Sequence, residues 1–237
     1  MHIRSPTELP KALLVAFLAA LVLLSPVYAQ EIQTAVFYPT DDAYIDLTAP
    51  GSNFGSASQL EVSWAPTQTK TVQIHHVAYL KFDLSIPDGS IIRSAALNIF
   101  VTSAPTNSSI LSVLPVKNTT WTETTITGKN APDIPKSEKE GRDKAMGEVK
   151  IAKPKAWYSL NVTSYARSVR SGLLSLMVVG GNTQSPYRDI ISFYSKESPD
   201  MAFQPYLEVA YSTQEGGGGP RIIYLTLRSN LAGGSLY

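Results

Sequence analysis

The 237-residue chain has no cysteine and only three histidines, and its acidic and basic side chains nearly balance. The absence of cysteine excludes a disulfide framework and thiol chemistry. A formal net charge of +1 gives no reason to expect binding to nucleic acid or to acidic membranes. His75 and His76 stand without an obvious nucleophile partner, and His2 lies in the N-terminal segment. We therefore expect a protein that is not an enzyme and requires no cofactor.

Long apolar runs are also scarce, apart from one at the N-terminus. Residues 11–24 form an apolar run that follows Arg4 and begins with Lys11, and Val27, Tyr28 and Ala29 come shortly after it. This order is typical of a secretory signal peptide. We expect residues 1–29 to be a signal peptide cleaved after Ala29, and the alternative is an uncleaved anchor. The mature protein is then secreted, as an extracellular or cell-surface protein.

Residues 30–213 contain many short segments in which apolar and polar side chains alternate. In residues 77–84 the even-numbered side chains are all apolar, while Lys81 and Asp83 fall on the other face, which predicts a half-buried strand. The same alternation predicts strands at residues 95–101, 158–162, 174–178 and 207–211, and we expect further strands at residues 60–64, 111–116 and 190–194. Turn signals separate them, at residues 49–53, 86–89, 104–107 and 180–182. Many short strands joined by turns indicate an all-β sandwich or barrel.

Two segments of this domain depart from the strand pattern. Residues 163–171 read as a helical turn that Thr163 caps and Gly172 stops, with Ala166 and Val169 packed inward. Residues 133–155 are charged and flanked by proline, and we expect them to form a long exposed loop.

The C-terminal residues read as separate from the β domain. Residues 214–220 are a glycine-rich linker, and residues 221–237 are a strand-like or disordered tail. The tail has three possible roles: a frayed end, a strand paired with its own domain, or a strand added to a neighbouring subunit by self-association.

Several sequence blocks, in a fixed order, resemble one known family. The blocks are residues 42–46, 53–56, 60–62, 79–87, 91–97, 121–127, 160–165, 193–198 and 205–209. They resemble DNRLRE domains, which are grouped with carbohydrate-binding module family 96 and related to disaggregatase-type repeats of surface proteins. The resemblance implies a jelly-roll-like antiparallel β-sandwich that binds a polysaccharide or cell-envelope glycan.

Sugar recognition requires flat apolar side chains beside polar groups that bond to hydroxyls. Trp64 is the tryptophan that we select as a ligand-binding residue, because Trp121 and Trp157 lie at strand ends where packing in the core or at its rim is the more common role. A second set of candidates occupies the loop after Gly180 and Gly181: Tyr187, Arg188 and Asp189.

Lys196 and Glu197 are further ligand-binding candidates. They follow a predicted strand as a pair of opposite charges. Such a pair can contact a sugar, or it can close the end of the sandwich without any ligand.

Asp41, Asp42 and Asp46 form an acidic group near a turn that contains proline and glycine. Carboxylate and carbonyl oxygens are the ligands that Ca²⁺ prefers, so the group predicts a possible structural calcium ion. The spacing is not that of an EF-hand, and the alternative is that Asp42 caps a turn while Asp41 is solvated.

Three asparagines begin glycosylation sequons: Asn107, Asn118 and Asn161. Asn107 has the most favourable setting because it lies beside a predicted turn, and attachment of a glycan requires exposure.

Two main hypotheses for the function follow. The first is a carbohydrate-binding module with an exposed aromatic platform. The second is a structural subunit of a surface layer, filament or adhesin, in which the tail inserts into a neighbouring molecule. An unrecognised hydrolase or lyase is a third hypothesis, which no recognisable motif supports.

Intact-mass analysis of the secreted protein tests the N-terminal and glycosylation predictions together. We expect a chain that starts at Gln30 and carries additional glycan mass. A mass that includes residues 1–29 would contradict cleavage, and a mass equal to the bare chain would contradict glycosylation.

Overall fold

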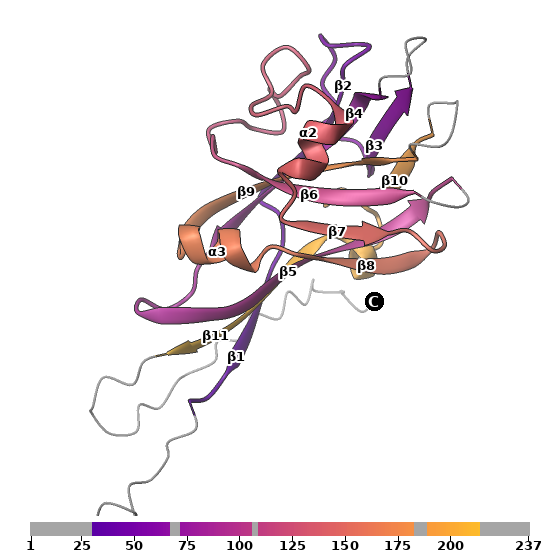
Figure 1. Cartoon of the computed structure of the whole chain (residues 1–237). Coiled ribbons are helices and arrows are strands. Elements are labelled where there is room, and N and C mark those ends of the chain that lie inside the picture. The colour runs from indigo at the N-terminus through magenta and orange to yellow at the C-terminus, as the bar shows by residue number, and fades with distance from the viewer. Residues whose placement is uncertain (1–29, 67–71, 106–108, 183–188, 214–237) are drawn as a thin grey trace, which may run out of the picture.

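Antiparallel strand pairing organises the chain in the computed structural model, which describes residues 30–66, 72–105, 109–182 and 189–213 (Figure 1). The strands are β1 (Gln33–Phe37), β2 (Asp41–Asp46), β3 (Gln59–Pro66), β4 (Val72–Leu84), β5 (Ser90–Ser103), β6 (Ile110–Val116), β7 (Gly147–Lys150), β8 (Ala156–Asn161), β9 (Gly172–Gly181), β10 (Ile191–Tyr194) and β11 (Tyr206–Thr213). The short helices are α2 (Glu138–Asp143), α3 (Thr163–Val169) and the 3₁₀ turn η1 (Met201–Phe203). The all-β fold predicted from the sequence is confirmed.

The strands form two layers of one curled sheet. In the first, which we call the β5 layer, β8 lies on one side of β5, while β11 and β10 follow one another on the other side and β1 pairs with β11. In the second, the β4 layer, β2 pairs with β4, and β9, β6 and β7 follow on the opposite side. Strand β3 joins the layers, because its first half pairs with β10 and its second half with β4. The result is the expected sandwich-like architecture.

The inner core fills the space between the layers. It contains the even-numbered side chains of β4 from residue 78 onward, including Leu80 and Phe82, and the odd-numbered side chains of β5 from residue 95 to residue 101, including Leu97 and Ile99. All four are fully buried. The period-two alternation of both strands therefore determines which side chains build this core.

A second apolar cluster, the outer core, covers the opposite face of the β4 layer. It includes Val77 and Tyr79 of β4 together with Trp121 and Ile126, which belong to the segment after β6. The Tyr79 hydroxyl donates a hydrogen bond to the Pro132 carbonyl at 2.7 Å. The prediction that β4 is half-buried was therefore wrong, because residues 117–134 pack over the face that sequence alternation assigned to solvent.

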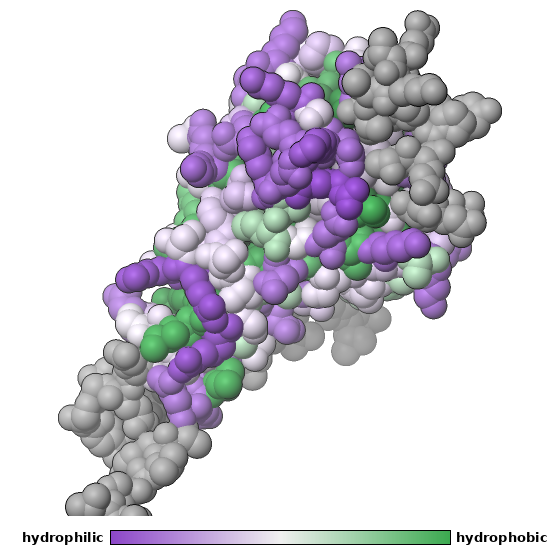
Figure 2. All heavy atoms as spheres, viewed as in Figure 1, coloured by the Kyte–Doolittle hydropathy of each residue, from purple (hydrophilic) through white to green (hydrophobic). Residues whose placement is uncertain are grey.

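Residues 133–155 are a second correction, since they are not an uninterrupted loop. They contain α2, which the Ser137 side chain caps by accepting a hydrogen bond from the Glu140 backbone N–H, and β7, which pairs with β6. Charges spaced four residues apart pair along the helix, as Arg142 does with Glu138 and Lys144 with Glu140. Such ion pairs stabilise an exposed helix, so the high charge of this segment was not evidence for a loop. Figure 2 shows hydrophilic side chains gathered over α2.

The predicted helical turn is present as α3, with Ala166 buried and with Gly172 just beyond its end at a φ of 89°. Thr163 does not cap it. Its hydroxyl instead accepts a hydrogen bond from the Ala95 backbone N–H of β5 at 3.0 Å. Strands β1, β2 and β7 were not predicted as strands.

Neither α2 nor α3, nor any other helix in the described ranges, has the length and apolar character of a membrane-spanning helix. The predicted signal peptide, the linker and the C-terminal tail lie outside the described residues.

Because the outer core covers the face of β4 that the sequence assigned to solvent, a substitution of a side chain that it covers should be strongly destabilising. We expect Tyr79→Ala to reduce the free energy of unfolding by about 3–5 kcal/mol, because it empties a fully buried aromatic site and leaves the Pro132 carbonyl without its partner. Urea denaturation measures the change. Asp83→Ala, on the same face of β4 but exposed, is the matched control and should cost about 0.5 kcal/mol or less. Equal, small effects of both variants would contradict the outer core.

Candidate functional site

Aromatic side chains gather on the outer surface of the β5 layer. Residues 97, 99 and 101 of β5 point into the inner core, so Phe100 points outward. Strand pairing places Trp157 of β8 opposite Phe100. Together with aromatic residues of β10, η1 and β11 they form a set that we call the aromatic face: Phe100, Trp157, Tyr194, Phe203 and Tyr206.

Neighbouring rings hold one another in fixed orientations across this face. The centroids of Phe100 and Phe203 lie 4.4 Å apart, and Tyr194 stacks on Phe203 at 5.8 Å with an interplanar angle of 18°. Trp157 makes edge contacts with Phe100 at 5.6 Å and with Tyr206 at 5.3 Å. Trp157 is also 39% exposed, so its indole is held by two neighbouring rings and is open to solvent as well.

Polar side chains border the aromatic face on the same strands. Asn98 and Thr102 lie two residues before and after Phe100, and Ser159 lies two residues after Trp157, so all three point outward as well. The Thr102 hydroxyl donates to Gln59 Oε1 at 2.7 Å, which fixes its orientation. An apolar surface bordered by amides and hydroxyls is the combination that recognition of a sugar requires.

Two of the three tryptophans, Trp64 and Trp157, occupy places that differ from those expected. Trp64, selected as a ligand-binding residue, is fully buried in the outer core and offers no face to a sugar, which corrects its assignment. Trp121 is buried, as expected, and its indole N–H donates to Ser175 Oγ at 2.9 Å. Trp157 is the exposed one. Period-two alternation could have found it, since a strand with Leu160 pointing inward has residue 157 pointing outward.

None of the remaining ligand-binding candidates belongs to the aromatic face, and two of them lie outside the described residues. Tyr187 and Arg188 lie outside the described residues, and Asp189 is half-buried. Lys196 and Glu197 do form the expected ion pair with each other. The Lys196 ammonium also lies 3.0 Å from Glu123 Oε2, a partner distant in sequence that the spacing did not indicate.

Glu123 and Glu197 lie close to Asp42, and we call these three residues the acidic cluster. One carboxylate oxygen from each lies within 4.8 Å of the others. The pKa of Asp42 is raised to about 8, mainly by burial and also by the negative charge of Glu197. The Lys196 backbone N–H donates to Asp42 Oδ2 at 2.7 Å and acts in the opposite direction. Burial opposes the charge of Lys196, but its hydrogen bonds to Glu197 and Glu123 hold its pKa above the ordinary value.

The other two acids of the predicted calcium group have separate partners. The Asp41 carboxylate lies 3.3 Å from Lys81 Nζ, and Asp46 accepts hydrogen bonds from the backbone N–H and hydroxyl of Thr48. Among the described residues, the group with metal-ligand spacing contains Asp42 but neither Asp41 nor Asp46. Strand β2 accounts for part of the difference, because Asp41 and Asp42 point to opposite faces of an extended chain, whereas Asp46 shares the face of Asp42 but lies four residues, about 13 Å, further along it.

A row of Ser63, His76 and Asp46 crosses three paired strands. Ser63 Oγ lies 2.7 Å from His76 Nδ1, and His76 Nε2 lies 3.5 Å from Asp46 Oδ2. This order of groups is that of a Ser–His–Asp triad. Ser63 is fully buried in the sheet, however, so no substrate can reach its hydroxyl. The row is a buried structural network.

Two of the predicted glycosylation sites can be placed. Asn118 and Asn161 are exposed, and the Oδ1 atom of each accepts a backbone hydrogen bond from the residue two positions later. Asn107 lies outside the described residues.

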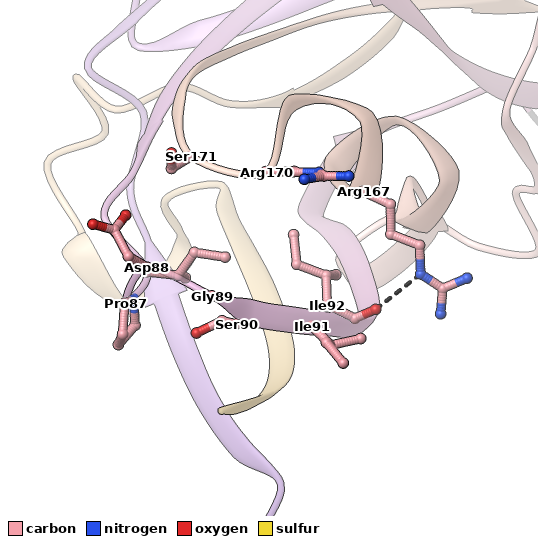
Figure 3. Close-up of a pocket in the computed structure, with 10 residues that line it drawn as sticks. Pro87, Asp88, Gly89, Ser90, Ile91, Ile92, Arg167, Arg170 and Ser171 are labelled. Carbon is pink, nitrogen blue, oxygen red and sulfur yellow. Dashed lines mark hydrogen bonds between the residues drawn. The ribbon is translucent and has the colours of Figure 1, made fainter. Parts of the chain in front are cut away.

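A groove of about 540 Å³ lies where the turn before β5 faces the end of α3 (Figure 3). The Arg167 guanidinium borders it, but that side chain already donates to the Ile92 carbonyl at 2.8 Å and to the Arg93 carbonyl at 2.7 Å. Among the described residues, none that line the groove is aromatic. It therefore lacks the surface on which a sugar ring stacks.

An antiparallel sandwich with an exposed aromatic face is the arrangement of a carbohydrate-binding module, a class of non-catalytic binding domain. The model of carbohydrate-binding module family 96 matches residues 33–211. The chain belongs to this family, as the sequence blocks predicted. Comparison with curated proteins finds no match.

Because Lys81 is buried beside Asp41, we expect the stability of the protein to depend strongly on this pair. Its ammonium contacts Asp41, donates to the Trp121 carbonyl and lies 4.5 Å from the centre of the Trp121 ring. We expect Lys81→Met to destabilise the protein by about 3 kcal/mol, because Asp41 loses its counter-charge in a poorly solvated place. In a double-mutant cycle, Asp41→Asn should recover part of that loss. Strictly additive effects in urea denaturation would contradict the pairing.

Proposed function

We propose that this protein binds a polysaccharide through its aromatic face and is exported to do so. The observation that carries the proposal is the half-exposed Trp157, whose indole is held between Phe100 and Tyr206. A rigid exposed ring gains contact with the apolar face of a pyranose and loses little conformational entropy when the sugar binds.

The shape of the site favours an extended glycan over a small ligand. The aromatic rings come from β5, β8, β10, η1 and β11, so they spread across the layer and do not line a deep pocket. Membership of a carbohydrate-binding family agrees with this ligand class. The apolar run at residues 11–24 supports export, which would bring the domain to extracellular or cell-envelope glycans.

Binding of the protein to a polysaccharide array tests the proposal, followed by titration of the best ligand. We expect Trp157→Ala to weaken binding at least tenfold, about 1.4 kcal/mol, because the exposed indole provides the largest stacking surface of the face. Leu173→Ala removes a comparably exposed apolar side chain from β9, in the other layer, and should leave affinity unchanged.

Circular dichroism and thermal melting establish that both variants are folded. Absence of glycan binding, or binding that Trp157→Ala leaves intact, would contradict the proposal.

A further inference from the structure

The acidic cluster brings together three carboxylates from segments far apart in the sequence. Asp42 lies in β2, Glu123 in the segment that covers the outer core, and Glu197 three residues after β10. Placing like charges so close costs free energy unless an opposite charge lies among them.

Lys196 supplies only part of that opposite charge. Its ammonium pairs with Glu123 and Glu197, and Asp42 receives only a backbone N–H. With all three carboxylates ionised, the single ammonium leaves two negative charges without compensation, and the raised pKa of Asp42 reflects its burial together with that cost. The neighbouring pair of Asp41 and Lys81 is neutral and changes nothing in this balance.

Two carboxylate oxygens in the cluster have no hydrogen-bond donor. Asp42 is fully buried, yet its Oδ1 accepts no hydrogen bond from any described residue, and the same is true of the buried Oε2 of Glu197. A buried carboxylate oxygen without a partner is costly and uncommon in folded proteins. In the cluster to which both residues belong, a bound cation would give each of these oxygens a partner.

We propose that Asp42, Glu123 and Glu197 bind a divalent cation of the calcium class. The ion would take Asp42 Oδ1, Glu197 Oε2 and an oxygen of Glu123 as ligands, with water in its remaining positions, because Glu123 and Glu197 are partly exposed. Oxygen-only ligands without histidine or cysteine favour Ca²⁺ over transition metals, and the irregular cluster suits its flexible coordination better than the strict octahedron of Mg²⁺. Two positive charges also match the two that Lys196 leaves uncompensated.

The proposed ion would link parts of the fold that strand pairing does not hold together. Glu123 belongs to the cover of the outer core, and Gly55 passes so close that a Cβ there would lie 2.0 Å from the Glu123 carbonyl oxygen. Lys196 accepts a hydrogen bond from Gln204 Nε2 on its carbonyl at 2.6 Å, which closes the segment between β10 and β11. The ion is therefore expected to stabilise the domain whether or not a glycan is bound.

The test uses the whole secreted protein, stripped with EGTA and titrated with CaCl₂ in the absence of any glycan. Isothermal calorimetry should show one site per chain, and at about 100 times the Kd the melting temperature should rise by about 5 °C. Asp42→Asn keeps an acceptor for the Lys196 N–H but removes a buried charge. This variant should melt no lower than the parent protein in EGTA, and it should lose the response to calcium.

Asp83→Asn, an exposed change of the same kind on β4, is the matched control and should keep the full response. The proposal fails if the parent shows neither heat nor a shift at 10 mM CaCl₂, about tenfold above the Kd of about 1 mM that the weakest protein calcium sites have. It also fails if the shift persists in Asp42→Asn, or if MgCl₂ produces an equal shift. A melting temperature that depends on pH through Asp42 without any response to calcium would show that a shared proton takes the place of the ion.

Discussion

Burial of β4 on both faces is the constraint on which the rest of the structure depends. A strand in a simple two-layer sandwich has one face against the core and one against solvent. Here Leu80 and Phe82 face the inner core, and Val77 and Tyr79 face an outer core. The second apolar face must be covered, and residues 117–134 cover it with Trp121 and Ile126. This cover also carries Glu123 to the acidic cluster, so the packing of one strand positions a charged site elsewhere.

The two layers consequently differ in what they can do. The outer surface of the β4 layer is occupied by the cover and by α2, whereas the outer surface of the β5 layer carries the aromatic face, in which Trp157 is 39% exposed. Aromatic rings left on an open sheet expose apolar surface to water, which is unfavourable unless a ligand covers it. The β4 layer therefore contributes mainly to stability, and the surface of the β5 layer is available for binding, in keeping with a carbohydrate-binding module of family 96.

Much of the fold could be predicted from local pattern. Alternation identified five of the strands and side chains that they contribute to the inner core, such as Leu97 and Leu160, because the period of a strand is fixed by its backbone. Three more strands were expected where the structure has β3, β6 and β10. The family blocks agreed with the match over residues 33–211. For the candidate site, the sequence indicated the type of surface, aromatic and bordered by polar groups, but it selected the buried Trp64 and placed Trp157 among the packing residues.

Residue type and spacing over a few positions were enough to predict the strand periodicity, the family and the nature of the chemistry. Long-range packing settled which tryptophan is exposed, that both faces of β4 are buried, and that Asp42 meets Glu123 and Glu197 instead of Asp41 and Asp46. Each of these features depends on contacts between residues that are tens of positions apart in the sequence. Period-two alternation assigns a side chain to one face of its strand, but what covers that face depends on segments that the local pattern does not place.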